Sequence, residues 1–273
     1  MNAPVDGFDA LAQIIDAFQD VAVAVSGGVD SLTLATLIHS RIPARAAMFH
    51  AVSPAVPAEA TRRVEALAEE QGWTLSIVDA GEFMDADYRA NPVNRCFFCK
   101  TSLYGAIAPR TQAQIVSGTN LDDLGEYRPG LDAAKQHAVR HPFVEAGVDK
   151  TAVRALARRL GLGALSELPA APCLSSRIET GIGIDPAMLQ LVHETEKLVG
   201  AALHPGTVRC RVRASGVVVE LDEAALAATG RAQREELSGR IAELFNSGGF
   251  NYAVSFAPYR VGSAFLHPVR VTS

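Results

Sequence analysis

The feature that most constrains the fold is the segment Val21–Ser31, which has the sequence VAVAVSGGVDS. Five small β-forming residues in a row are typical of a fully buried strand, and the apolar spacing of residues 32–38 is typical of a helix. The glycines between them let the backbone turn tightly and approach a ligand closely. Backbone N–H groups at a helix start, with the hydroxyls of Ser26 and Ser31, bind anions. The segment therefore predicts a phosphate-binding loop.

The motif SGGVDS differs from two common phosphate-binding motifs. It lacks the lysine of the GxxxxGK(S/T) loop, and it does not match the GxGxxG dinucleotide fingerprint. It resembles the pyrophosphatase loop of enzymes that cleave ATP between its α and β phosphates. An ordinary strand-turn-helix corner is the alternative interpretation. The predicted ATP-binding residues of the loop are Ser26, Gly27, Gly28, Val29, Asp30 and Ser31.

Composition excludes several classes of protein. A chain of 273 residues with 48% hydrophobic and 20% charged residues is normal for one large or two ordinary globular domains. The net charge of −5 argues against a general polyanion binder, so nucleic acid is not an expected partner. No apolar run is long enough for a membrane span, and residues 1–10 lack the features of a signal peptide. We expect a cytoplasmic protein.

Strand and helix patterns alternate through the first part of the chain. Apolar periodicity, proline near helix starts and glycine after helix ends indicate the boundaries. The expected strands are 44–52, 73–78 and one beginning at 115, and the expected helices are 8–19, 57–72 and 149–160. This order predicts an α/β fold with a parallel sheet, helices on both faces and ligands at the carboxyl ends of the strands.

The sequence GTNLDD at 118–123 lies where the strand beginning at 115 is expected to end. Its backbone and amide groups are expected to face a nucleotide, and its two aspartates are candidate Mg²⁺ ligands or hydrogen-bonding partners. A solvated turn is the alternative interpretation. The residues assigned to ATP here are Gly118, Thr119, Asn120 and Asp123.

The remaining sequence predicts a smaller α+β domain over residues 166–273, after a first domain over residues 1–165. Asp185 and the proline after it indicate a helix start. The expected elements are a helix over 185–202, a hairpin of strands 207–213 and 216–221, a helix over 231–245 and a strand over 252–256.

Three cysteines are candidates for chemistry. Cys96 and Cys99 lie one turn apart at the start of an expected helix, where the helix dipole and the flanking Arg95 and Lys100 favour thiolates. Cys173 follows in a proline-rich loop. Three thiolates leave one metal position open, which suits a cluster iron or a zinc ion. Reduced structural cysteines are the alternative for the CxxC pair.

Arginines alternate along the first strand of the expected hairpin. Arg209, Arg211 and Arg213 share one face of the strand, and Cys210 is on the other, where we expect it in the core. Three guanidinium groups on one face repel one another unless negative charge lies between them. The arginines either bind a phosphate or carboxylate, or pair with Glu220 across the hairpin on a surface strand.

Six motifs occur in a specific order: SGGVDS at 26–31, NPVNRCFFCK at 91–100, GTNLDD at 118–123, YRPG at 127–130, PCLSSR at 172–177 and YRVGS at 259–263. Together they resemble the LarE family of ATP-dependent sulfur transferases, which builds the nickel-pincer nucleotide cofactor of lactate racemase. The resemblance implies a PP-loop (adenine nucleotide α-hydrolase-like) first domain. It also implies that ATP adenylates a carboxylate of pyridinium-3,5-biscarboxylic acid mononucleotide, with release of AMP and pyrophosphate, and that sulfur makes a thiocarboxylate.

The resemblance implies further site residues and partners. A metal ion is implied at Glu196 and Glu220. The family commonly forms rings of identical subunits, so we expect a homo-oligomer whose other partner is a small nucleotide substrate. The residues assigned to this substrate are Arg95, Lys100, Arg128, Ser176, Arg177, Arg211 and Arg213.

The cysteines separate two branches of this family. In the best-known members the cysteine that matches Cys173 gives up its own sulfur and becomes dehydroalanine, and the CxxC pair is absent. Because Cys96 and Cys99 are present here, the chain resembles the three-cysteine branch. That likeness implies a [4Fe-4S] cluster on all three cysteines, with an extra sulfide on its unique iron. Sacrificial donation by Cys173, and zinc or no metal in place of the cluster, are the alternatives.

Other functions are compatible with the loop motif. A tRNA thiolase also uses three-cysteine clusters, but the acidic chain weighs against tRNA. An amide-forming ligase such as NAD synthetase has no need of three clustered cysteines. A zinc-stabilised regulator would bind ATP and zinc without releasing pyrophosphate.

Overall fold

The computed structural model describes residues 7–125, 128–169 and 172–266. The chain divides into two compact units, which we call unit 1 (residues 1–83 and 96–171) and unit 2 (residues 84–95 and 172–273). The predicted boundary lies between residues 165 and 166, whereas in the structure residues 84–95 belong with the C-terminal unit. Tyr127 of the YRPG motif and residues 170–171 of the proline-rich loop lie outside the described residues.

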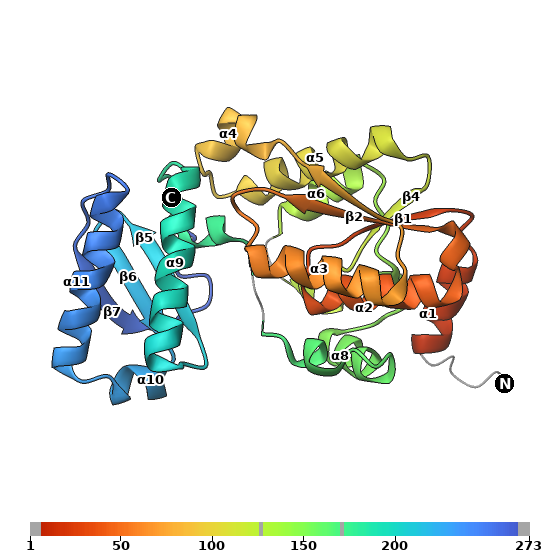
Figure 1. The fold of residues 1–273 in the computed structure, drawn as a ribbon. Coiled ribbons are helices and arrows are strands. Elements are labelled where there is room, and N and C mark those ends of the chain that lie inside the picture. Colours follow the sequence, from red (N-terminus) through yellow and green to blue (C-terminus); the bar gives the residue numbers. More distant parts are fainter. Residues whose placement is uncertain (1–6, 126–127, 170–171, 267–273) are drawn as a thin grey trace, which may run out of the picture. The chain divides into compact units, whose positions relative to one another are not determined.

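Unit 1 is built around a four-stranded, entirely parallel sheet with the strand order β3-β2-β1-β4. Figure 1 labels β1, β2 and β4 of this sheet. The strands are β1 (Val21–Ala24), β2 (Ala46–Val52), β3 (Leu75–Asp79) and β4 (Gln114–Ser117). The helices of this part are α1 (Gly7–Asp16), α2 (Val29–Arg41), α3 (Ala58–Gln71), α5 (Arg95–Ile107), α6 (Gly130–Gln136), α7 (Pro142–Glu145) and α8 (Lys150–Arg159). The predicted α/β fold with a parallel sheet is therefore confirmed.

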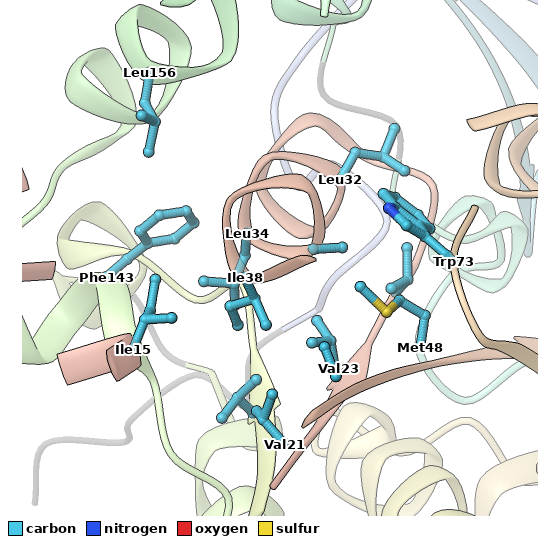
Figure 2. Close-up of a cluster of buried hydrophobic side chains, with 14 of the residues drawn as sticks. Ile15, Val21, Val23, Leu32, Leu34, Ile38, Met48, Trp73, Phe143 and Leu156 are labelled. Carbon is cyan, nitrogen blue, oxygen red and sulfur yellow. The ribbon is translucent and has the colours of Figure 1, made fainter. Parts of the chain in front are cut away.

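The apolar run of β1 is explained by burial on both faces of the sheet. Val21 and Val23 pack in a cluster with residues of α1, α2 and α8, as Figure 2 shows for Ile15, Leu34 and Leu156. Ala22, which points to the opposite face, packs in a second cluster with residues of α5 and α6. Because successive side chains of a strand alternate between faces, a strand covered on both sides has no polar positions.

Unit 2 contains a three-stranded sheet in the order β5-β6-β7, in which β5 and β6 form an antiparallel hairpin and β7 runs parallel to β6. The strands are β5 (Val208–Arg213), β6 (Gly216–Leu221) and β7 (Val254–Pro258). The helices are α4 (Ala86–Arg89), α9 (Pro186–Leu203), α10 (Glu223–Ala228) and α11 (Arg231–Ser247). The hairpin and both long helices match the predicted elements, and the Asp185 side chain caps α9 by accepting hydrogen bonds from two backbone N–H groups.

Within residues 7–125, 128–169 and 172–266, no helix combines the length and the apolar character that a membrane span requires.

Replacement of Leu34 tests the importance of the cluster around α2. Leu34 is fully buried, so Leu34→Ala leaves a cavity and is expected to lower the free energy of unfolding by about 2–5 kcal/mol. Leu124→Ala is the matched control, because Leu124 is 49% exposed and its loss should cost less than about 0.5 kcal/mol. Urea unfolding followed by circular dichroism measures the free energy of unfolding of both variants. Equal losses of stability in the two variants would contradict the assigned core.

Candidate functional site

The loop between β1 and α2, which we call the phosphate loop after its predicted ligand, is organised by its own hydrogen bonds. Ser31 Oγ accepts from the Ser26 backbone N–H at 3.0 Å and donates to Gly28 O at 3.0 Å. Gly27 has a φ of 79°, and a Cβ at this position would lie 2.7 Å from Ala60 O, so only glycine fits. Gly28 is the N-cap of α2 and makes no side-chain capping bond. The start of α2 is thus arranged to bind an anion through its backbone N–H groups.

The loop after β4 lies directly against the phosphate loop. A Cβ on Gly118 would lie 2.8 Å from both Asp30 C and Ser31 N, so the two backbones are in contact here. Asn120 is 2% exposed, and its Nδ2 donates to Asp30 Oδ1 at 3.3 Å. The structure therefore brings together two groups of residues that the sequence placed at the nucleotide site.

The remaining residues of this second loop mainly bind one another. The hydroxyls of Thr119 and Ser117 lie 3.1 Å apart. Asp123 Oδ2 accepts from the Asn120 backbone N–H at 3.1 Å, while Asp123 Oδ1 pairs with Arg128 Nη2 at 2.9 Å. Asp123 therefore orders this loop and holds Arg128, which the sequence analysis had assigned to the substrate.

Lys150 belongs to the same site, although the sequence analysis did not identify it. Its Nζ donates to both carboxylate oxygens of Asp30, at 2.7 and 2.5 Å. Lys150 is the first residue of α8, where a cation opposes the helix dipole. This unfavourable position is the feature of the sequence from which a special role for Lys150 could have been predicted. The lysine places a positive charge beside the loop that we expect to hold phosphate.

His50 is a second site residue that the sequence analysis missed. It is fully buried on β2, with Nδ1 2.8 Å from Val25 O and Nε2 2.9 Å from the Thr61 hydroxyl. Since a carbonyl only accepts, Nδ1 carries the proton, and Nε2 accepts from Thr61 in the neutral ring. Burial lowers the pKa of His50. The ring braces the residue that links β1 to the phosphate loop.

The three candidate cysteines lie near the starts of two helical segments. Cys96 and Cys99 lie one turn apart near the start of α5 in unit 1, and Cys173 is the N-cap of a short 3₁₀ helix, Leu174–Arg177, in unit 2. All three are reduced and partly exposed. Within the described ranges, no three His, Cys, Asp or Glu side chains are grouped as a metal site. The i, i+3 spacing and exposure of the pair suit two soft ligands of a cluster or zinc ion.

Lys100 lies one residue beyond the CxxC pair on α5. Its side chain packs near Gly130, and its Nζ lies 6.0 Å from the centre of the Tyr104 ring.

The turn that carries Cys173 is held by residues that the sequence analysis assigned to a substrate phosphate. Arg177, which is 3% exposed, donates from Nη1 to Pro172 O at 2.6 Å and to Cys173 O at 3.2 Å. Its Nε and Nη2 bind the two oxygens of Glu196 at 2.9 and 3.1 Å. Ser176 Oγ donates to Cys173 O at 2.7 Å. In this structure these side chains fix the cysteine turn.

Two arginines of β5, Arg211 and Arg213, pair with a carboxylate across the hairpin. Glu220, 1% exposed, accepts from Arg211 Nε at 3.0 Å and from Arg213 Nη2 at 2.6 Å. The pairing matches one of the two interpretations of the alternating arginines, but the strand is buried rather than on the surface. Cys210 is fully buried, as expected for a core residue, and burial raises the pKa of its thiol. A metal ion at Glu196 or Glu220 would have to displace guanidinium groups.

Comparison with known proteins gives three relatives, while no protein-family model matches the chain. An uncharacterized protein of Synechocystis sp. is 36% identical over 190 residues, which cover 68% of this chain and 70% of the relative. An uncharacterized protein of Methanocaldococcus jannaschii is 25% identical over 207 residues, 74% and 78% of the two chains. The pyridinium-3,5-bisthiocarboxylic acid mononucleotide synthase of Lactiplantibacillus plantarum is 30% identical over 213 residues, 76% of each.

The lowered pKa of His50 predicts how stability depends on pH. The unfolded chain takes up a proton on this residue near pH 6.5, whereas the folded chain does so only at lower pH, so folding loses stability as pH falls through about 6.5. His50→Gln removes this contribution. Urea unfolding at pH 7.5 and 5.5 should show a smaller pH dependence in the variant, and an unchanged dependence would contradict the assignment.

Proposed function

Because the chain belongs to the family of pyridinium-3,5-bisthiocarboxylic acid mononucleotide synthase, the LarE family, we propose that it is a sulfur transferase acting on the nickel-pincer precursor. The observation that carries the ATP-dependent part is the start of α2, which has no side-chain cap and lies against Gly118. Backbone N–H groups, two serine hydroxyls and Lys150 gather at one sheet edge. This arrangement favours a bound polyphosphate.

In the proposed reaction, a substrate carboxylate oxygen attacks the α phosphate of ATP, and the bond to the β phosphate breaks. Pyrophosphate leaves, and its negative charge is stabilised by the N–H groups of α2 and by the Ser26 and Ser31 hydroxyls. A sulfur nucleophile then attacks the acyl carbon of the adenylate and AMP leaves, so the carboxylate becomes a thiocarboxylate. Activation is needed because a carboxylate has no good leaving group.

Mg²⁺ belongs to the proposal as a companion of ATP. The carboxylates at this edge already accept hydrogen bonds: Asp30 from Lys150, Asp122 from the Lys150 backbone N–H, and Asp123 from Asn120. We therefore propose that Mg²⁺ arrives with the nucleotide rather than residing in the protein. It would share with Lys150 the neutralisation of phosphate charge.

For sulfur delivery we propose that Cys96, Cys99 and Cys173 hold a [4Fe-4S] cluster, which when bound supplies the sulfide. The three reduced, partly exposed thiols are the soft ligands that such a cluster requires. Buried Cys210 is unsuited to this role because its thiol resists ionisation. The homo-oligomeric state and the cytoplasmic location stay predictions.

Gly118→Ala tests the nucleotide site. The added Cβ would overlap the backbone of Asp30 and Ser31, so the phosphate loop must shift, and we expect ATP to bind at least about tenfold more weakly. Gly125→Ala is the matched control, because a Cβ there meets nothing within 4 Å. Calorimetric titration with ATP measures both variants. Equal affinities would contradict this placement of the nucleotide.

Anaerobic assay with ATP and the dicarboxylate mononucleotide tests the function. We expect AMP, pyrophosphate and a thiocarboxylate product, together with about four iron atoms per chain that Cys99→Ala loses. Pyrophosphate release without iron, with a loss of sulfur mass at Cys173, would replace the cluster with sacrificial donation. Bound zinc without pyrophosphate release would support the regulator instead and overturn the enzyme proposal.

A further inference from the structure

Arg95 is a buried cation that nucleotide binding does not explain. It is 2% exposed, and its Nη1 donates to Asn91 Oδ1 at 2.5 Å and to Ser175 O at 2.9 Å. Its guanidinium carbon lies 5.4 Å from the centre of the Phe265 ring. Both hydrogen-bond acceptors are neutral oxygens, and Nη2 has no hydrogen-bond partner among the described residues. Burying a charge in this way is costly, so the position calls for a specific reason.

The carbonyl groups of the turn around Cys173 explain why Arg95 is buried. Arg177 binds the carbonyls of residues 172 and 173, Arg95 binds that of Ser175, and Arg211 Nη1 binds that of Ser176 at 3.0 Å. Each of these arginines is at most 4% exposed. Four carbonyls of one short turn are therefore fixed by three buried guanidinium groups. Hydrogen bonds with a charged donor are stronger than neutral ones, so the turn is held rigidly.

The segment before Arg95 is tied to the same stretch of unit 2. Asn91 is fully buried, and its Nδ2 donates to the carbonyls of Glu179 and Ile182, both at 2.9 Å. The Tyr88 hydroxyl lies 2.7 Å from Ser175 Oγ. Arg95 is thus not the only contact between this segment and the cysteine turn region. Asn91 and Tyr88 also anchor the backbone that carries Arg95.

We propose that Arg95 is a positioning residue that fixes the Cys173 turn through Ser175 O. Arg95 also immediately precedes Cys96 in the sequence, so the same residue adjoins the CxxC pair and holds the turn of the third cysteine. The role in holding the turn follows from the contacts within unit 2. The consequence for sulfur chemistry rests on the proposed function.

The test is Arg95→Met, with Arg89→Met as the matched control and Arg95→Lys as the conservative variant. Arg89 lies on the same segment, but it is exposed, and its backbone bond to Ile184 survives the change. In the metal-free protein we expect amide hydrogen exchange of residues 174–178 to become about tenfold faster in Arg95→Met, the factor for losing one hydrogen bond to a charged donor. Arg89→Met should match the wild type, and Arg95→Lys should recover part of the protection.

A second measurement addresses sulfur chemistry. After anaerobic reconstitution, Arg95→Met should keep less iron per folded chain than Arg89→Met and show an altered iron–sulfur absorption spectrum. Unchanged exchange at 174–178, or equally faster exchange throughout unit 2, would overturn the positioning role. If the wild type takes up no iron, the cluster assignment fails, while the exchange result still decides the role of Arg95. If Arg95→Met exchanges faster but reconstitutes like the wild type, the link to sulfur chemistry is overturned.

Discussion

The contact between Gly118 and the backbone of Asp30 and Ser31 is the constraint on which the candidate nucleotide site depends. Two parallel neighbouring strands, β1 and β4, end at the same edge of the sheet, and their loops approach without any side chain between them. This closeness lets Asn120 reach Asp30, and Asp30 in turn holds Lys150. The start of α2, where we propose that phosphate binds, is therefore one part of a connected polar network, which is rigid because its members are bonded to one another.

Unit 2 has a different physical basis, because buried guanidinium groups add to the backbone hydrogen bonds of the turn around Cys173. Glu196 and Glu220 offset part of this positive charge, and main-chain carbonyls solvate the rest. The two carboxylates compensate the buried charges of Arg177, Arg211 and Arg213, whereas Arg95 is buried against neutral oxygens. Cys173 is presented at the edge of this network, partly exposed, whereas Cys210 on β5 is enclosed in the core. The same unit keeps one thiol accessible and another inert.

Local sequence patterns were sufficient to predict part of this structure. The strand, glycine turn and helix of Val21–Ser31 follow from periodicity, which neighbouring residues determine. Pairing of the β5 arginines with Glu220 was one of two open alternatives, and the register places Arg209 rather than Arg211 directly opposite Glu220. Lys150 and Asp30 are 120 residues apart, and nothing near either residue indicates their pairing. The burial of Arg95 was also not predictable, because a flanking arginine beside two cysteines equally suits an exposed role. Such contacts depend on which distant segments meet, and local sequence patterns do not show this.

Residues 84–95 belong to unit 2, so this unit cannot be separated from the rest of the chain by a single cut. The chain passes between the two units at three points, and the carbonyls of Glu179 and Ile182 obtain their amide partner from Asn91, far upstream. A fragment that begins at residue 172 would leave these acceptors without that donor. Unit 2 is consequently built from two separate stretches of the chain, and it cannot be added or removed at a single join.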